Sequence, residues 1–170
     1  MIKTVCFLAL FSSVLISCQT EKSTGKYPAT VGDIEFDEKI DDPAFEKCTP
    51  EKLMSIQYYQ GKKEFNYKGE KLAIIEKLQK ENISSETKMN GYITVRFLVN
   101  CEGKTGLFRV QQMNTDQKET SPDKELGERL LRFTKSLDGW IPKEIKGFKA
   151  GYYQYLTYKI ENGKVSEVLP

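Results

Sequence analysis

The feature that most constrains the fold is a regular alternation of side chains between Gly91 and Asn100. Successive side chains of a β-strand point to opposite faces, so this stretch predicts a strand with one face turned toward a hydrophobic core. Turn-forming residues follow at 100–104, and apolar residues then recur up to Met113, which predicts a second strand and a hairpin. The apolar face of the first strand consists of Ile93, Val95, Phe97 and Val99.

Two other segments have the spacing of an amphipathic α-helix. The first covers residues 70–83. The second is expected to begin at Ser121-Pro122-Asp123, with Ser121 as the N-cap and the proline in the first turn, and to end at Gly139. The apolar stripes are Leu72, Ile74, Ile75 and Leu78 in the first helix and Leu126, Leu130, Phe133 and Leu137 in the second.

The end of the chain predicts more strand. Residues 152–160 are rich in aromatic and β-branched side chains, and Asn162-Gly163 is a strong signal for a two-residue hairpin turn, so residues 164–169 would fold back as a short fourth strand. The order of elements predicts an α+β fold in which a three-stranded antiparallel sheet, extended by this fourth strand where the hairpin forms, packs on two helices.

At the start of the chain, Lys3 precedes an apolar run over residues 5–16, which ends in Leu15-Ile16-Ser17-Cys18. The first 17 residues thus resemble the signal peptide of a bacterial lipoprotein, because these four residues match the sequence at which such leaders are cut and acylated. The resemblance implies a diacylglyceryl group on the Cys18 sulfur and a further acyl chain, such as palmitate, on its amino group. An uncleaved membrane anchor and a soluble secreted protein cut elsewhere are the alternatives, although the run is shorter than the roughly 18 residues of a spanning helix.

A lipid anchor would place the protein in the bacterial cell envelope. Gln19, in place of an aspartate after the lipidated cysteine, favours the outer membrane over the inner by analogy with other lipoproteins. The predicted parts of the chain are a signal peptide at 1–17, a lipidated flexible tether at 18–30, an N-terminal extension packed on the domain at 31–64, and the domain itself at 65–170.

The extension carries alternating acidic and apolar residues. Over residues 31–47 this pattern predicts a half-buried strand and a turn that ends at Asp42-Pro43. The carboxylates have neither the regular spacing of a calcium loop nor the opposed pair of a general acid and base. We therefore expect no metal site and no catalytic residues in this part of the chain.

The cysteine count follows from the leader. Of four cysteines, Cys6 would leave with the signal peptide and Cys18 would carry lipid, which leaves Cys48 and Cys101. Because the envelope is oxidising, this pair is expected to form a disulfide, with two buried free thiols as the alternative. A metal site is not expected, since the chain has no histidine and the two cysteines lie far apart in sequence.

Composition argues against two classes of function. The 26 basic and 24 acidic residues are interspersed, so the sequence shows no basic stripe of the kind that binds nucleic acid. General acid–base catalysis most often uses histidine, and no serine or cysteine stands in a recognisable arrangement with a base. We expect no enzymatic activity, no cofactor and no nucleic-acid partner.

A series of motifs runs from about residue 65 to residue 160. It comprises the strand opening at 91–97, Gly103 in the turn, the helix at 126–137, Trp140-Ile141-Pro142, Gly147 and the closing aromatic strand. In this order and spacing the segment resembles the C-terminal domain of TonB-like proteins. The resemblance implies a tryptophan packed beneath the sheet and recognition of an extended peptide by addition of a strand at a sheet edge.

The chain also departs from that family. A lipoprotein leader stands where the family has a membrane helix, the Pro-rich spacer is missing, and Ser84-Ser85 lies where a Tyr-Pro step is frequent. Coupling to an inner-membrane motor is therefore not implied, and only the fold and the peptide-binding mode are carried over.

These observations predict a non-catalytic module that binds a protein or an extended peptide, for example from an outer-membrane transporter. Binding would use main-chain hydrogen bonds along residues 152–160, with Arg96, Tyr153 and Tyr155 lining the face. Alternatively, these tyrosines only cover the sheet and the Asn162-Gly163 hairpin occupies the edge. A small-ligand or lipid carrier, with a pocket between sheet and helices, is the competing function.

Overall fold

The computed structural model describes residues 33–48, 56–57, 65–120, 123–145 and 147–169. The predicted signal peptide, Cys18 and the tether at 18–30 lie outside the described residues. Within the described ranges, neither helix is long and apolar enough to cross a membrane.

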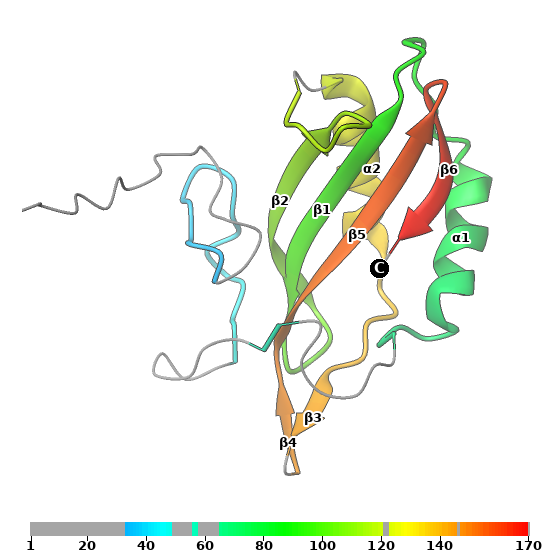
Figure 1. The fold of residues 1–170 in the computed structure, drawn as a ribbon. Helices are drawn as coiled ribbons and strands as arrows, with labels where there is room; N and C mark the ends of the chain where they lie inside the picture. The colour runs from blue at the N-terminus through cyan, green and yellow to red at the C-terminus, as the bar shows by residue number, and fades with distance from the viewer. Residues whose placement is uncertain (1–32, 49–55, 58–64, 121–122, 146, 170) are drawn as a thin grey trace, which may run out of the picture.

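Two helices and a four-stranded antiparallel sheet form the main body of the domain (Figure 1). The strand order is β2-β1-β5-β6, and β3 and β4 form a separate two-stranded sheet. The α+β class and the fourth strand are thus confirmed, whereas the second sheet was not predicted. The elements are α1 (Glu70–Glu81), β1 (Gly91–Val99), β2 (Thr105–Met113), α2 (Lys124–Ser136), β3 (Lys143–Ile145), β4 (Phe148–Ala150), β5 (Tyr152–Glu161) and β6 (Lys164–Leu169).

The main core lies between the sheet and the two helices. Strands β1 and β5 pair from Gly91↔Ile160 to Val99↔Tyr152 and form the middle of the sheet. The predicted alternation in β1 is confirmed, because its four apolar residues are fully buried in this core. The predicted stripe of α2 is also buried there, and α1 contributes Ile74 and Leu78. Trp140 joins the same core, with its ring 5.1 Å from that of Phe97 and 4.9 Å from that of Tyr67.

The start of α2 differs from the prediction. The N-cap is Asp123, whose Oδ1 accepts a hydrogen bond from the Leu126 N–H at 3.1 Å, so the prediction of Ser121 as the N-cap was wrong. The Gln112 side chain fixes the position of this cap, because it accepts from the Asp123 N–H at 2.8 Å and donates to the Asp123 carbonyl at 3.0 Å. Contact with β2, not local sequence alone, therefore sets where the helix begins.

The turn between β5 and β6 has the predicted two-residue form. Asn162 and Gly163 both have positive φ, at 51° and 74°, as a type I′ turn requires. The Ser85 N–H donates to the Gly163 carbonyl at 2.8 Å, which joins this turn to the loop after α1. The hairpin thereby adds β6 to the sheet, next to α1.

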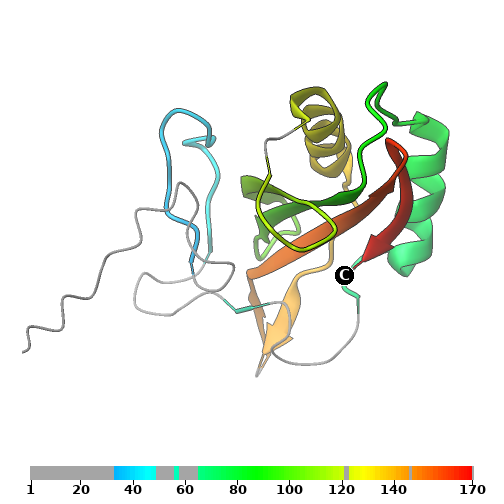
Figure 2. The same cartoon turned by 45° about the horizontal axis from the view of Figure 1, so that its top comes forward.

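Residues 33–48, which we call the N-terminal strap, cover part of the sheet face opposite the helices. Figures 1 and 2 show the strap on the far side of the molecule from α1. Ile34 and Phe45 pack there with Leu98, Leu107 and Tyr153 in a second, smaller core. Part of the sheet is therefore buried on both faces.

The strap contains no strand, so the predicted half-buried strand at 31–47 is wrong over the described residues 33–48. Its backbone bonds to side chains of the domain instead of to a neighbouring strand. The Ile34 N–H donates to the Tyr153 hydroxyl at 2.8 Å, Arg109 donates to the Glu35 carbonyl at 2.6 Å, and Asn100 donates to the Glu46 carbonyl at 3.0 Å.

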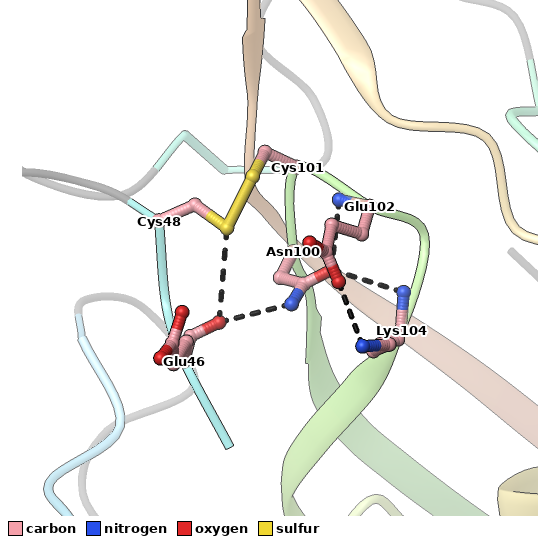
Figure 3. The surroundings of a disulfide bond; sticks show 6 residues. All are labelled: Glu46, Cys48, Asn100, Cys101, Glu102 and Lys104. Atoms are coloured by element: carbon pink, nitrogen blue, oxygen red, sulfur yellow. Dashed lines mark hydrogen bonds and ion pairs between the residues drawn. A yellow bond between two sulfur atoms is a disulfide. The ribbon is translucent and has the colours of Figure 1, made fainter. Parts of the chain in front are cut away.

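A disulfide closes the end of the strap. Cys48 and Cys101, 53 positions apart, are bonded with their α-carbons 5.8 Å apart, which confirms the predicted pair. Figure 3 shows the bond joining the strap to the turn between β1 and β2, beside the hydrogen bond from Asn100 to the Glu46 carbonyl. The strap is thus covalently part of the domain.

We expect the double variant Cys48→Ala, Cys101→Ala to lower the free energy of unfolding by about 4 kcal/mol, because the crosslink restricts the unfolded chain over a loop of 53 positions. Denaturant unfolding followed by Trp140 fluorescence measures the change. Equal unfolding midpoints for the oxidised wild type and the double variant would contradict a stabilising role of the bond.

Candidate functional site

The predicted binding residues Arg96, Tyr153 and Tyr155 do lie together on the sheet face opposite the helices. The guanidinium carbon of Arg96 is 4.6 Å from the centre of the Tyr153 ring and 5.8 Å from that of Tyr155. However, Arg96 and Tyr153 are buried, and Arg96 also approaches the Gln57 side-chain oxygen at 3.4 Å. Their role in binding stays a prediction, and a partner would reach Tyr153 only after the strap had moved.

The predicted edge along β5 is occupied by the chain itself. Strand β6 pairs with β5 from Thr157 to Glu161, so β5 is an interior strand over that length. At its beginning, Ile56 forms a parallel bridge with Tyr152 and accepts the Tyr153 N–H at 2.8 Å. The hairpin at Asn162-Gly163 therefore places β6 on the edge of β5, as the alternative interpretation of the sequence expected.

An ion pair fixes the strap over this face. Both Asp41 carboxylate oxygens accept hydrogen bonds from the Arg109 guanidinium, at 2.8 and 2.7 Å, and the Asp41 side chain is only 2% exposed. Burial alone would raise the pKa of Asp41, but hydrogen bonds from Arg109 and from the Asp37 N–H outweigh it and hold the pKa below its usual 3.8. The strap is therefore attached most firmly when this carboxylate is charged.

Strand β6 provides the exposed edge of the sheet on this side. The Tyr153 N–H points away from β1, so odd-numbered residues of β5 turn their backbone polar groups toward β6. Lys159 is one of these odd-numbered residues, and it lies opposite Glu167. The backbone N–H and carbonyl of Glu167 therefore point inward, toward β5. The N–H and carbonyl of the next residue, Val168, consequently face the outer edge.

A groove of about 470 Å³ lies between this edge and α1. Buried Leu78 and Val168 and half-buried Ile75 and Val165 give it an apolar floor. Charged and polar side chains stand around them, so the groove offers apolar contact and hydrogen bonds together. The lining residues are Lys71, Ile75, Leu78, Gln79 and Asn82 from α1 and its C-cap, Ile83 and Ser84 from the loop, and Lys164, Val165, Ser166, Glu167 and Val168 from β6.

The loop after α1 closes one end of the groove. Asn82 ends the helix in the left-handed conformation, with φ 45°, and Ser84 then forms an antiparallel bridge with Lys164. Arg129 of α2 donates to the Ser84 carbonyl at 2.6 Å and holds this loop. The loop at Ser84 thus pairs with the first residue of β6. An extended ligand could pair in the same way with the residues of β6 that follow.

The groove lining combines apolar side chains with lysine, glutamate, serine and amide side chains. Its described lining contains neither histidine nor cysteine. In the part of the chain that the structure describes, no group of three or more His, Cys, Asp or Glu side chains is placed to hold a metal ion. Sequence reasoning missed this site, although the Asn162-Gly163 turn signalled the strand that forms its wall.

Comparison of the chain with protein-family models, with curated proteins and with solved structures gave no match.

We expect Asp41→Asn to destabilise the protein by about 3 kcal/mol at neutral pH, because it leaves Arg109 without its charged partner in a largely buried site. The pKa of Asp41 is lowered in the folded state, so its contribution is present above pH 3.8 and is lost as the pH falls through the folded-state pKa. As the pH is lowered from 7 to 2, the unfolding midpoint of the variant should therefore decrease less steeply than that of the wild type. The control is Glu38→Gln, at an exposed strap residue, and an equal effect of both variants would refute the role of the ion pair.

Proposed function

We propose that this protein is a lipid-anchored, non-catalytic module of the bacterial cell envelope that binds an extended peptide by β-strand addition to β6. The observation that carries the proposal is the groove between α1 and the outer edge of β6, where the backbone of Val168 faces outward above an apolar floor. An edge strand beside a helix lets a peptide gain main-chain hydrogen bonds on one side and side-chain contacts on the other.

The groove favours a particular kind of peptide. In a strand, alternate side chains point to the same face, so every second residue of the ligand would pack on Ile75, Leu78 and Val168. The groove lining contains two basic residues, Lys71 and Lys164, and one acidic residue, Glu167. This net positive charge favours a ligand that carries an acidic side chain. The proposed ligand is an apolar, mildly acidic segment that is extended when bound.

The opposite edge of the sheet is a weaker candidate. At the end of β2 the chain turns back on itself, with a bridge between Met113 and Glu119 and a hydrogen bond from the Thr120 N–H to the Gln112 carbonyl at 3.3 Å. Strand β2 also carries a bulge, where Leu107 has a φ of 54°. Such features disfavour pairing with a further strand.

The resemblance to TonB-like domains supports the same mode of binding, since that family adds a peptide strand to a sheet edge. Here the lipoprotein leader replaces the membrane helix, so the proposal includes binding but no transmission of force. A segment of an outer-membrane transporter is the partner that this resemblance favours. The competing carrier function has less support, because the groove lies open along the surface and would leave an apolar ligand in contact with water.

Site-specific photocrosslinking in cells tests the peptide site. A benzoylphenylalanine at Gln79, in the groove lining, should capture a partner, whereas the same group at the adjacent Lys80, outside the lining, should not. A synthetic peptide with the captured sequence should then slow amide exchange of Val168 at least about tenfold, since strand addition covers that N–H. Equal capture from both positions, an unchanged Val168 exchange rate, or capture of a lipid instead of a protein would refute the proposal.

A separate experiment tests the anchor. Cells supplied with labelled palmitate should incorporate the label into the wild type and not into Cys18→Ser, which should also remain unprocessed and change its membrane fractionation. Mass spectrometry of the wild type should show the leader removed and the Cys18 sulfur acylated. A bare thiol in an uncut chain would disprove lipid anchoring and leave the peptide site untouched.

A further inference from the structure

The hairpin of β3 and β4 stands apart from the main sheet. It extends beyond the end of the sheet where β5 begins, opposite the β5–β6 turn (Figure 1). Its register is Lys143↔Ala150, Glu144↔Lys149 and Ile145↔Phe148, so Phe148 stands at the tip. An isolated two-stranded ribbon is only marginally stable, and this one presents a large apolar side chain to solvent.

Phe148 is 77% exposed, the largest fraction among the exposed large apolar side chains of the described residues. Ile141, just before the hairpin, is 43% exposed. At the base of the ribbon, by contrast, Lys143 is buried, with its Nζ 5.2 Å from the centre of the Tyr152 ring and 3.4 Å from the Gln57 carbonyl. The hairpin is thus fixed at its base and apolar at its tip.

The strap enters the domain at this same end of the sheet. Ile34 is hydrogen-bonded to the hydroxyl of Tyr153, the second residue of β5, and Phe148 precedes Tyr153 by five residues, or about 17 Å along the chain. Residues 19–32, between Cys18 and the strap, would span about 50 Å at full extension. A membrane held by Cys18 is therefore within reach of the hairpin tip.

We propose that the β3–β4 hairpin is a second membrane contact, in which Phe148 inserts into the interface between the headgroups and acyl chains of the bilayer. The inference rests on the proposed lipid anchor, which keeps the hairpin close to the membrane. Aromatic side chains suit this interface, and a lipid anchor with an added contact holds more firmly than either alone.

The contact is apolar in origin. Lys149 and Glu144 are paired in the register and carry opposite charges, and the sequence adds one further lysine, Lys146, between the two strands. Insertion of the Phe148 side chain should therefore occur on zwitterionic vesicles, and anionic lipid should add a salt-dependent attraction through Lys146. It would direct the β5–β6 turn, and with it the Lys164 end of the groove, away from the bilayer.

The test replaces residues 1–18 with a hexahistidine tag and attaches the chain to phosphatidylcholine vesicles that contain a nickel-chelating lipid. An environment-sensitive fluorophore is placed at Phe148→Cys and, as a matched control, at Leu72→Cys, an exposed apolar position on α1. We expect a blue shift and quenching by nitroxide-labelled lipids at position 148 only. Equal emission and quenching at the two positions would overturn the proposal.

A second measurement uses side-chain removal. Phe148→Ser should speed dissociation of the tethered chain in imidazole about tenfold, whereas Leu72→Ser should leave the rate unchanged. Both side chains are exposed, so unfolding midpoints equal to that of the wild type would show that the fold is kept. Equal dissociation rates for the wild type and Phe148→Ser would also overturn the proposal. Because the tag replaces Cys18, these outcomes do not depend on whether the natural chain is acylated.

Discussion

The rest of the structure depends on the pairing of β1 with β5, because one half of this central pair is buried on both faces. Toward the helices, Val95 and Leu156 are fully buried, and on the other face Leu98 and Tyr153 are fully buried beneath the strap. A sheet with apolar side chains on both faces needs a cover on each. The helices supply one cover and the strap supplies the other, so the strap belongs to the core of the domain.

Patterns in the sequence correctly predicted those helices and strands that are specified by their own residues. Strict alternation identified β1, the stripe ending at Leu137 identified α2, and Asn162-Gly163 identified β6. Strands β3 and β4 were missed because three residues are too few to establish a period of two. The shared face of Arg96, Tyr153 and Tyr155 was predictable from alternation, but their burial was not, because it arises from a segment distant in sequence. The groove likewise depends on how α1 lies beside β6, which no local pattern encodes.

The edges of the sheet differ in how far the chain itself covers them, and this difference is why the proposed partner is placed at β6. The first part of β5 extends past the end of β6 and is bridged by Ile56, and the end of β2 is met by the returning chain at Glu119. At the edge of β6, the bridge between Ser84 and Lys164 covers the beginning of the strand. An uncovered strand edge invites pairing with other chains, and α1 limits which chains fit by standing alongside it. In the proposed function, the groove would therefore accept a single extended segment more readily than a second sheet.

If the chain is anchored by a lipid at its N-terminus, the disulfide would also limit how far a force on the anchor can detach the chain from the sheet. A pull on the anchor would reach the strap at its first residues and would first separate Ile34 from Tyr153, then Asp41 from Arg109. It would then meet the covalent bond between Cys48 and Cys101, which passes the pull to the turn between β1 and β2 (Figure 3). Peeling of the chain would stop there, so Ile56 and Gln57, which lie beyond the bond in sequence, would stay on the edge of β5. Under such a pull, the crosslink would separate the strap, which yields, from the sheet, which has to stay intact for the proposed binding at β6.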